Sequence, residues 1–153
     1  MIANSSNIVV DPRDVLKKEV KASFFSYVQY FWDVIIAEDP VWNWHIPYLC
    51  AELEKAVRRL FKGKKKKYDL IINIPPGTTK STLISVMLHN WCWLHIPSMR
   101  TIVASHTRDL AIDLAGRGRD IVESPKHMNL FPHLELRRDQ RNKAHWANNY
   151  NGS

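Results

Sequence analysis

Residues 68–82 read YDLIINIPPGTTKST and carry the strongest structural pattern in the chain. The run 68–74 is short and mostly apolar, without a clean alternation, which is typical of a strand buried on both faces of a parallel sheet. Two prolines and Gly77 end the run, and Lys80 then begins a segment with helical periodicity. These residues therefore predict a strand, a tight loop and a helix in direct succession.

The same alternation continues after this stretch. We expect a helix from about Lys80 to Leu94, a second buried strand at 100–105, and a helix from Arg108 to about Val122. Strands that alternate with helices favour parallel pairing with a right-handed crossover. Before the run, Asp11-Pro12 and Pro47 predict the starts of two helices, the first extending to about residue 37 and the second to about residue 60. The predicted fold class is α/β, a βαβα core preceded by two helices.

The loop that links the first strand to its helix has the layout of a phosphate-binding loop. Backbone N–H groups and a helix N-terminus would face an anion, Lys80 would neutralise phosphate charge, and the Ser81 hydroxyl would lie on Mg²⁺. The match to G-x-x-x-x-G-K-[ST] is imperfect, because Ile74 and Thr79 occupy the two glycine positions. An ordinary turn with an exposed lysine is the alternative.

The excess positive charge is concentrated in one segment. The 153 residues include 22 Lys and Arg against 15 Asp and Glu, a net charge of +7. Seven cations and no acid lie between Arg58 and Lys67, which indicates either a polyanion contact or a solvated lysine loop. Only two cysteines occur, which excludes a disulfide scaffold, and no apolar run approaches the ~20 residues that span a bilayer.

The segments NIPPGTTKSTLISVMLHNWCW, PSMRTIVASHTRDLAIDLAGRGRDIVES, LFPHL and DQRNKAHW resemble the large terminase subunit of tailed bacteriophages. The resemblance runs from about Trp42 to the end of the chain. Pro75, Pro76, Lys80 and Ser81 match the family's variant P-loop, whereas Gly77 stands where the family often has arginine and Thr79 where it has glycine. The missing arginine removes a loop-borne charge that would stabilise the transferring phosphate.

This resemblance implies a partial P-loop NTPase that uses ATP and Mg²⁺. The implied domain is single and incomplete over 1–153, with a helical segment at 12–62 and the start of the βαβα core at 68–153. ATP phosphates would bind Gly77, Thr78, Thr79, Lys80, Ser81 and Thr82, with Mg²⁺ on Ser81. The adenine side would be formed by Trp42, Trp44 and His45, although the two tryptophans are equally consistent with core positions. DNA contact or coupling would involve Lys64, Lys65, Lys66, Lys67, His106 and Arg108.

The resemblance also implies partners and a location. These are double-stranded DNA, the small terminase subunit, the capsid portal and further copies of the same chain, in the host cytoplasm at the procapsid and away from any membrane. No apolar run after Ser81 ends in the acidic pair that holds Mg²⁺ and orients water, and no nuclease carboxylates follow. We therefore expect the front part of an ATPase domain that binds ATP without hydrolysing it alone, and we assign no catalytic residue. The alternatives are a helicase-like or other DNA-dependent P-loop ATPase, and a non-enzymatic, basic DNA-binding fragment.

Overall fold

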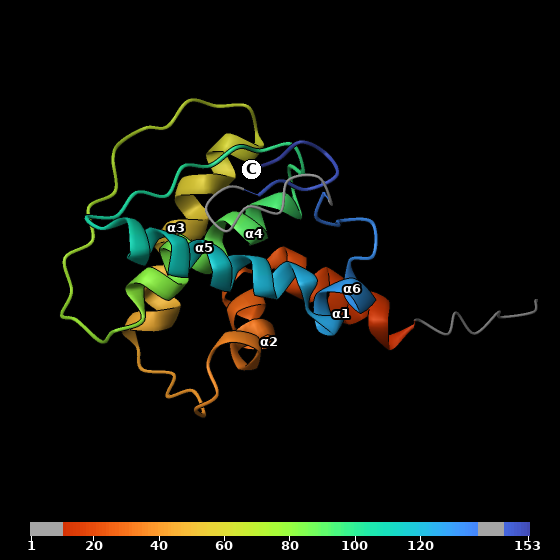
Figure 1. The fold of residues 1–153 in the computed structure, drawn as a ribbon, viewed down its shortest axis with the longest axis horizontal. Coiled ribbons are helices and arrows are strands. Elements are labelled where there is room, and N and C mark those ends of the chain that lie inside the picture. The colour runs from red at the N-terminus through yellow and green to blue at the C-terminus, as the bar shows by residue number, and fades with distance from the viewer. Residues whose placement is uncertain (1–10, 138–145) are drawn as a thin grey trace, which may run out of the picture.

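The computed structural model describes residues 11–137 and 146–153, and this part of the chain is helical (Figure 1). Its helices are α1 (Pro12–Ala22), α2 (Phe24–Ile35), α3 (His45–Phe61), the π-helix η1 (Thr82–Met87), α4 (Leu88–Trp93), α5 (Arg108–Glu123) and α6 (Pro125–Leu130). The backbone is helical without interruption from residue 80 to residue 93, so η1 and α4 form one continuous rod.

One helix was predicted for residues 12–37, but the structure has two, because the helix is interrupted at Ser23. Ser23 has an extended backbone, and its N–H ends α1 by donating to the Glu19 carbonyl at 3.2 Å. Its hydroxyl then caps α2 by accepting from the Ser26 N–H at 3.3 Å. A carboxylate oxygen of Glu54 on α3 accepts from the Phe24 N–H at 2.9 Å. Helical periodicity misses the break because Val20 and Phe24 keep the i, i+4 spacing of one apolar face across it.

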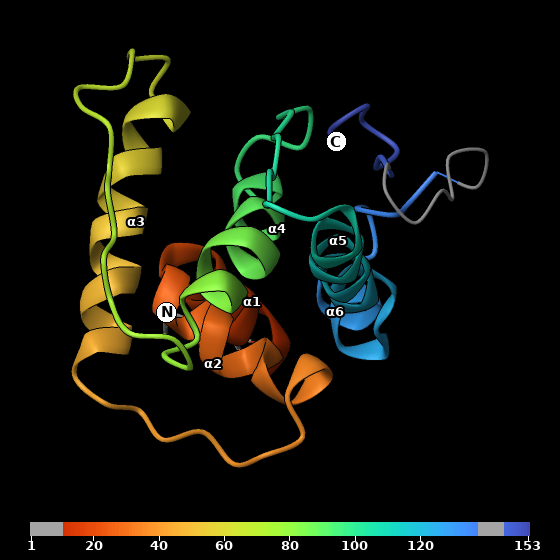
Figure 2. The ribbon, with the colours of Figure 1, turned by 60° about the vertical axis from the view of Figure 1, so that its left-hand side comes forward.

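The helices pack around α2, which contacts α1, α3, α4 and α5 (Figure 2). Trp91 of α4 is fully buried at this junction, with its ring centroid 5.4 Å from that of Phe24 and 5.6 Å from that of Phe61. The indole N–H donates to the Val20 carbonyl at 3.2 Å, which satisfies its only polar group. One side chain thus joins α1, α2 and the end of α3 to α4.

The predicted parallel sheet is wrong. No strand occurs among the described residues, whose only β-type pairing is an isolated antiparallel bridge between Leu136 and Asn148. Segments 68–74 and 100–105 are extended but lie on the surface, where Ile71 is 88% exposed and Ile102 is 96% exposed. The α/β βαβα fold is therefore replaced by an α-helical one. A short apolar run forms a buried strand only when other strands pair with it, and here η1 and α5 bury their apolar sides against each other instead.

The last described segment closes one side of the helical core. Residues 146–153 pack against the turn that follows α4, where Asn148 Nδ2 donates to the Pro97 carbonyl at 2.7 Å. The Thr101 hydroxyl donates to the Ser153 carbonyl at 3.2 Å. Trp146 is buried beside Trp93, with ring centroids 5.2 Å apart. In the described part of the chain, no helix has both the length and the apolar character needed to cross a membrane.

Candidate functional site

The loop before η1 turns the extended segment sharply into a helix. Gly77 and Thr79 both have positive φ angles, +77° and +60°. This region is open to glycine but costs a non-glycine residue about 1–2 kcal/mol, so the loop holds Thr79 in an unfavourable conformation. Two short hydrogen bonds fix the turn: the Thr78 hydroxyl donates to the Pro75 carbonyl at 2.7 Å, and the Thr79 hydroxyl donates to the Thr78 carbonyl at 2.6 Å.

The side chain of Lys80 folds back over this loop. Its ammonium donates to the Ile74 carbonyl at 2.7 Å and lies 3.5 Å from the Pro75 carbonyl. Among the described residues, no carboxylate forms an ion pair with it. The positive charge is therefore held at the loop by neutral carbonyl oxygens, which an anion can replace.

The helix that begins at this loop has uncapped N–H groups. The Leu83 N–H donates to the Thr79 carbonyl at 3.0 Å, which is the first bond of the helix, and no side chain caps its start. The N–H groups of Lys80, Ser81 and Thr82 precede that bond, as expected for the first turn of a helix. Such groups and the helix dipole attract anions. The loop, the lysine and the helix start thus converge on one electropositive position.

The Ser81 side chain is exposed, as a hydroxyl that reaches a phosphate-bound Mg²⁺ must be, whereas Thr82 is buried under the first turn. Among residues 11–137 and 146–153, no group of three or more His, Cys, Asp or Glu side chains forms a metal site. A metal ion at this loop would therefore arrive with the phosphates of a nucleotide, and Ser81 would be its protein contact.

The aromatic residues predicted for the adenine side divide into two environments. Trp42 is partly buried against the core, edge-on to Phe25 at 5.4 Å and to Trp32 at 5.0 Å between ring centroids. Trp44 is 78% exposed and precedes His45, the first residue of α3. In both views the loop before η1 lies beside the first turn of α3 (Figures 1 and 2). Of the two tryptophans, only Trp44 is free to stack on a base.

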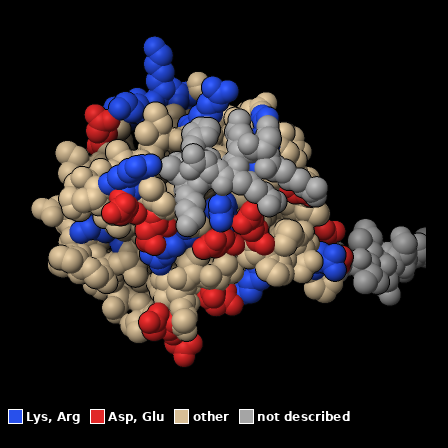
Figure 3. Space-filling model, in the orientation of Figure 1, with Lys and Arg blue, Asp and Glu red and all other residues tan. Residues whose placement is uncertain are grey.

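A basic hollow lies near the end of α3. It has a volume of about 420 Å³ and is lined by one acid, Glu54, and by five cations: Lys55, Arg58, Arg59, Lys62 and Lys64. Arg58 pairs with Glu54 at 2.7 Å and Lys55 with Glu52 at 3.9 Å, so part of the positive charge is compensated. Residues 62–67 beside it are exposed, and they form the blue patch at the top of Figure 3. Lys66 is the one member of the predicted lysine run with an ion pair in the described chain, to Asp69, and the pKa of that carboxyl is lowered by the lysine.

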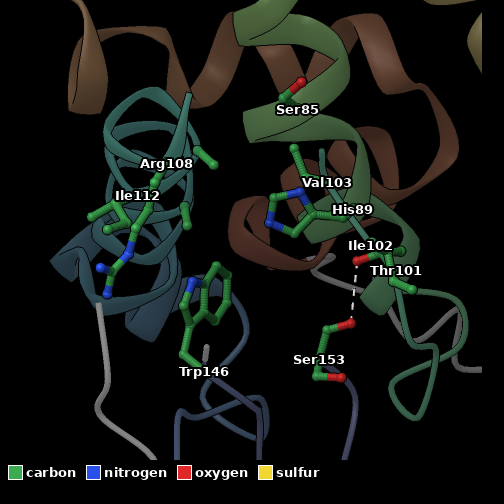
Figure 4. A pocket seen from close by; sticks show the side chains of 11 residues that line it. Ser85, His89, Thr101, Ile102, Val103, Arg108, Ile112, Trp146 and Ser153 are labelled. Atoms are coloured by element: carbon green, nitrogen blue, oxygen red, sulfur yellow. Dashed lines mark hydrogen bonds between the residues drawn. The ribbon is translucent and has the colours of Figure 1, made fainter. Parts of the chain in front are cut away.

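His106 and Arg108 flank the start of α5. Thr107 between them caps the helix, because its hydroxyl accepts from the Leu110 N–H at 3.4 Å. His106 is exposed, whereas Arg108 lines a cavity of about 270 Å³ (Figure 4). Neither this cavity nor the basic hollow brings either residue together with the lysine run, which lies between α3 and η1.

That cavity was not predicted from the sequence. His89 forms one wall, 92% buried between Trp93 and Trp146, with ring centroids 6.1 and 5.6 Å away. Burial lowers the pKa of His89 to about 4, so the imidazole is neutral at pH 7. Trp146 and Ser153 close the cavity, although Trp146 lies 57 positions after His89 in the sequence, and no local pattern could have indicated that contact.

No family model, curated protein or solved structure matches this chain. The terminase resemblance therefore rests on the motifs quoted above. The phosphate-binding residues, the adenine-side aromatics and the DNA contacts remain predictions, which the geometry of the loop and of the basic hollow now makes specific.

Proposed function

We propose that this chain binds ATP at residues 77–82 and is an ATP-binding segment of a terminase large subunit, the motor that packages phage DNA. The supporting observation is the position of Lys80, whose ammonium is held against the loop carbonyls at the start of an uncapped helix. The proposal rests on the loop and the start of its helix, and not on the α/β fold.

ATP binding would replace the hydrogen-bond partners of the Lys80 ammonium. The phosphates would take the place of the Ile74 and Pro75 carbonyls at the Lys80 ammonium, a change from neutral to charge-assisted hydrogen bonds. The uncapped N–H groups of the first turn would bind further phosphate oxygens. The exposed Ser81 hydroxyl would complete the coordination of a nucleotide-bound Mg²⁺. Trp44, beside the loop, would stack on the base.

The basic hollow supports double-stranded DNA as the second ligand. Arg59, Lys62 and Lys64 line this surface without an ion pair in the described chain, and the exposed run Lys64–Lys67 continues it; this excess of positive charge suits a phosphate backbone. By the same resemblance, the working partners would be the small terminase subunit, the capsid portal and further copies of the chain, in the host cytoplasm. The hollow also favours a second candidate, a DNA-binding protein without nucleotide.

Equilibrium titration with ATP, ADP and AMP, each with Mg²⁺, tests the proposal. If Lys80 and the first turn hold the outer phosphates, affinity falls in the order ATP, ADP, AMP. Equal affinities for ATP and AMP would mean that only the base is recognised, which would contradict the loop assignment. A parallel titration with a labelled duplex separates the two candidates, because DNA binding without any ATP binding supports the second.

A further inference from the structure

Segment 68–74 combines an apolar surface with an unpaired backbone. It forms the outer margin of the molecule in Figure 1 and passes across the front of α3 in Figure 2. Residues 65–78 make no backbone–backbone hydrogen bond with any other described residue. A long, exposed, apolar edge of this kind is a template for pairing with another strand.

The side chains of this segment alternate between two environments. Ile72 and Ile74 are partly buried and pack against the helical core. Ile71 between them is 88% exposed, and Asp69 and Asn73 share its outward side. One face of the segment is thus fixed to the protein, while Ile71 on its outward face is exposed and its backbone makes no backbone–backbone hydrogen bond, the Ile74 carbonyl being bound by the Lys80 side chain.

The sequence of the segment is nearly symmetrical about Ile71. In an antiparallel pair of two copies centred there, Leu70 would lie opposite Ile72 of the other copy, and Tyr68 opposite Ile74. These are apolar or aromatic pairs on one face of the ribbon, which stabilise antiparallel strands. Pro75 and Pro76, which lack backbone donors, end the ladder at each side.

The charges favour the same orientation. Parallel, in-register pairing would place the two lysine runs, Lys64–Lys67, side by side, and like charges opposite each other are destabilising. Antiparallel pairing moves the two runs to opposite ends of the ribbon. We propose that two copies of this chain associate about a two-fold axis through antiparallel pairing of residues 68–74, with Ile71 opposite Ile71. A two-fold interface of this kind is self-complementary and closes at a dimer.

Sedimentation velocity over a range of protein concentrations tests the proposal. The wild type is expected to be a dimer that dissociates on dilution, and Ile71→Pro, which removes a donor from the ladder, is expected to be a monomer. Ile102→Pro is the matched control, because Ile102 is an equally exposed isoleucine in the other extended segment. A monomeric wild type, species larger than a dimer, or an Ile71→Pro variant that remains dimeric would overturn the proposal.

A cysteine variant provides an independent test that does not rely on a disruptive substitution. Directly opposed residues in an antiparallel pair have Cα atoms about 4.5–5.5 Å apart, within the range of a disulfide. Ile71→Cys should therefore form a disulfide-linked dimer with diamide, and Ile102→Cys should not. Cys50 and Cys92 do not interfere, because burial raises the pKa of each thiol to about 12. Equal cross-linking at both positions would show non-specific collision and contradict the pairing.

Discussion

The ammonium of Lys80 donates a hydrogen bond to the carbonyl oxygen of Ile74, six residues earlier, at 2.7 Å. The bond joins the first turn of a helix to the end of the extended segment before it. It places a cation at the loop with no acidic partner among residues 11–137 and 146–153, and an arriving phosphate would displace neutral oxygens.

Lys80→Ala should weaken ATP binding. Loss of one charge-assisted hydrogen bond costs about 1.5–3 kcal/mol, roughly 10- to 150-fold in affinity. Titration with a fluorescent ATP analogue measures the effect. Lys18→Ala, which removes an exposed lysine of α1, is the matched control and should leave the affinity unchanged. If both variants bound like the wild type, the phosphate site would not be at this loop.

Hydrolysis by this chain alone should be negligible even when ATP is bound. No acidic pair ends an apolar run after Ser81, so no carboxylate holds Mg²⁺ or orients the attacking water. Mg²⁺-dependent phosphate release by the purified protein measures this. Steady release that disappears in Lys80→Ala would contradict the prediction and would direct attention to Asp109, Asp113 and Glu123 of α5.

Two glycines of α5 should respond in opposite ways to alanine. A Cβ at Gly116 would meet no atom within 4 Å, so Gly116→Ala should raise the free energy of unfolding by about 0.5–1 kcal/mol through helix propensity. A Cβ at Gly118 would lie 3.0 Å from His89 Nε2 and 3.3 Å from the Trp146 ring. Overpacking of about 1–3 kcal/mol should then cancel or exceed the gain. Urea unfolding of the two variants checks the difference, and equal stabilities would mean that His89 is not packed against α5.

Two buried histidines should make the protein lose stability at pH values above those at which carboxylates titrate. Burial lowers the pKa of His89 and of His127 to about 4, assisted at His127 by the charge of His133, whereas an unfolded histidine titrates near 6.5. Between these values only the unfolded chain binds the protons. The free energy of unfolding is therefore at its full value above about pH 6.5. It falls as the pH decreases towards 4, and each histidine contributes a loss of about 1.4 kcal/mol per pH unit.

His127→Leu tests this origin of the acid sensitivity. Neither ring nitrogen of His127 has a hydrogen-bond partner in the described part of the chain, so an apolar side chain should be tolerated at pH 7. Urea unfolding between pH 7 and pH 5 gives the slope of unfolding free energy against pH. In His127→Leu this slope should be smaller than in the wild type by about 1.4 kcal/mol per pH unit. An unchanged slope would show that other groups carry the effect.

Replacing Lys64, Lys65, Lys66 and Lys67 by Gln should reduce the salt dependence of duplex binding. Each phosphate neutralised contributes about −0.9 to the slope of log K against log salt, so the slope should flatten by up to about 3–4 units. Lys18→Gln with Lys21→Gln on α1 serves as the control and should have little effect. Equal slopes for the wild type and the four-Gln variant would identify the run as a solvated loop.

The sequence predicted where most of the helices lie, but not how they are assembled. The helix expected from Arg108 to about Val122 is found at Arg108–Glu123, and the one expected from Lys80 to Leu94 corresponds to the helical rod at 80–93. Caps and periodicity are local, so they are readable without the fold. The short helix α6 was missed, although Ser124 and Pro125 form a local start that was readable in the same way.

Contacts between segments that are distant in the sequence could not be predicted from such local patterns. An apolar run such as 68–74 has the same composition whether it is buried in a sheet or lies along a surface, and only its partners distinguish the two. Likewise, Trp42 and Trp44 are two positions apart with the same side chain, and Phe25 and Trp32 decide which of them is buried. The candidate loop was identified because its residues are contiguous. The cavity at His89 was not, because its walls come from separate parts of the chain.

The exposed lysine run also determines how a protease would act on the protein. Trypsin cleaves after lysine in accessible chain, and residues 64–67 lie in an exposed connection between α3 and the rod at 80–93. The two fragments would remain associated, because Phe61 and Trp91 pack against each other across the cut, as do Phe24 and Trp91. Cleavage at the lysine run would therefore separate the chain on a denaturing gel but leave one particle in solution. The helical core would therefore hold together even when the backbone is cut at the lysine run.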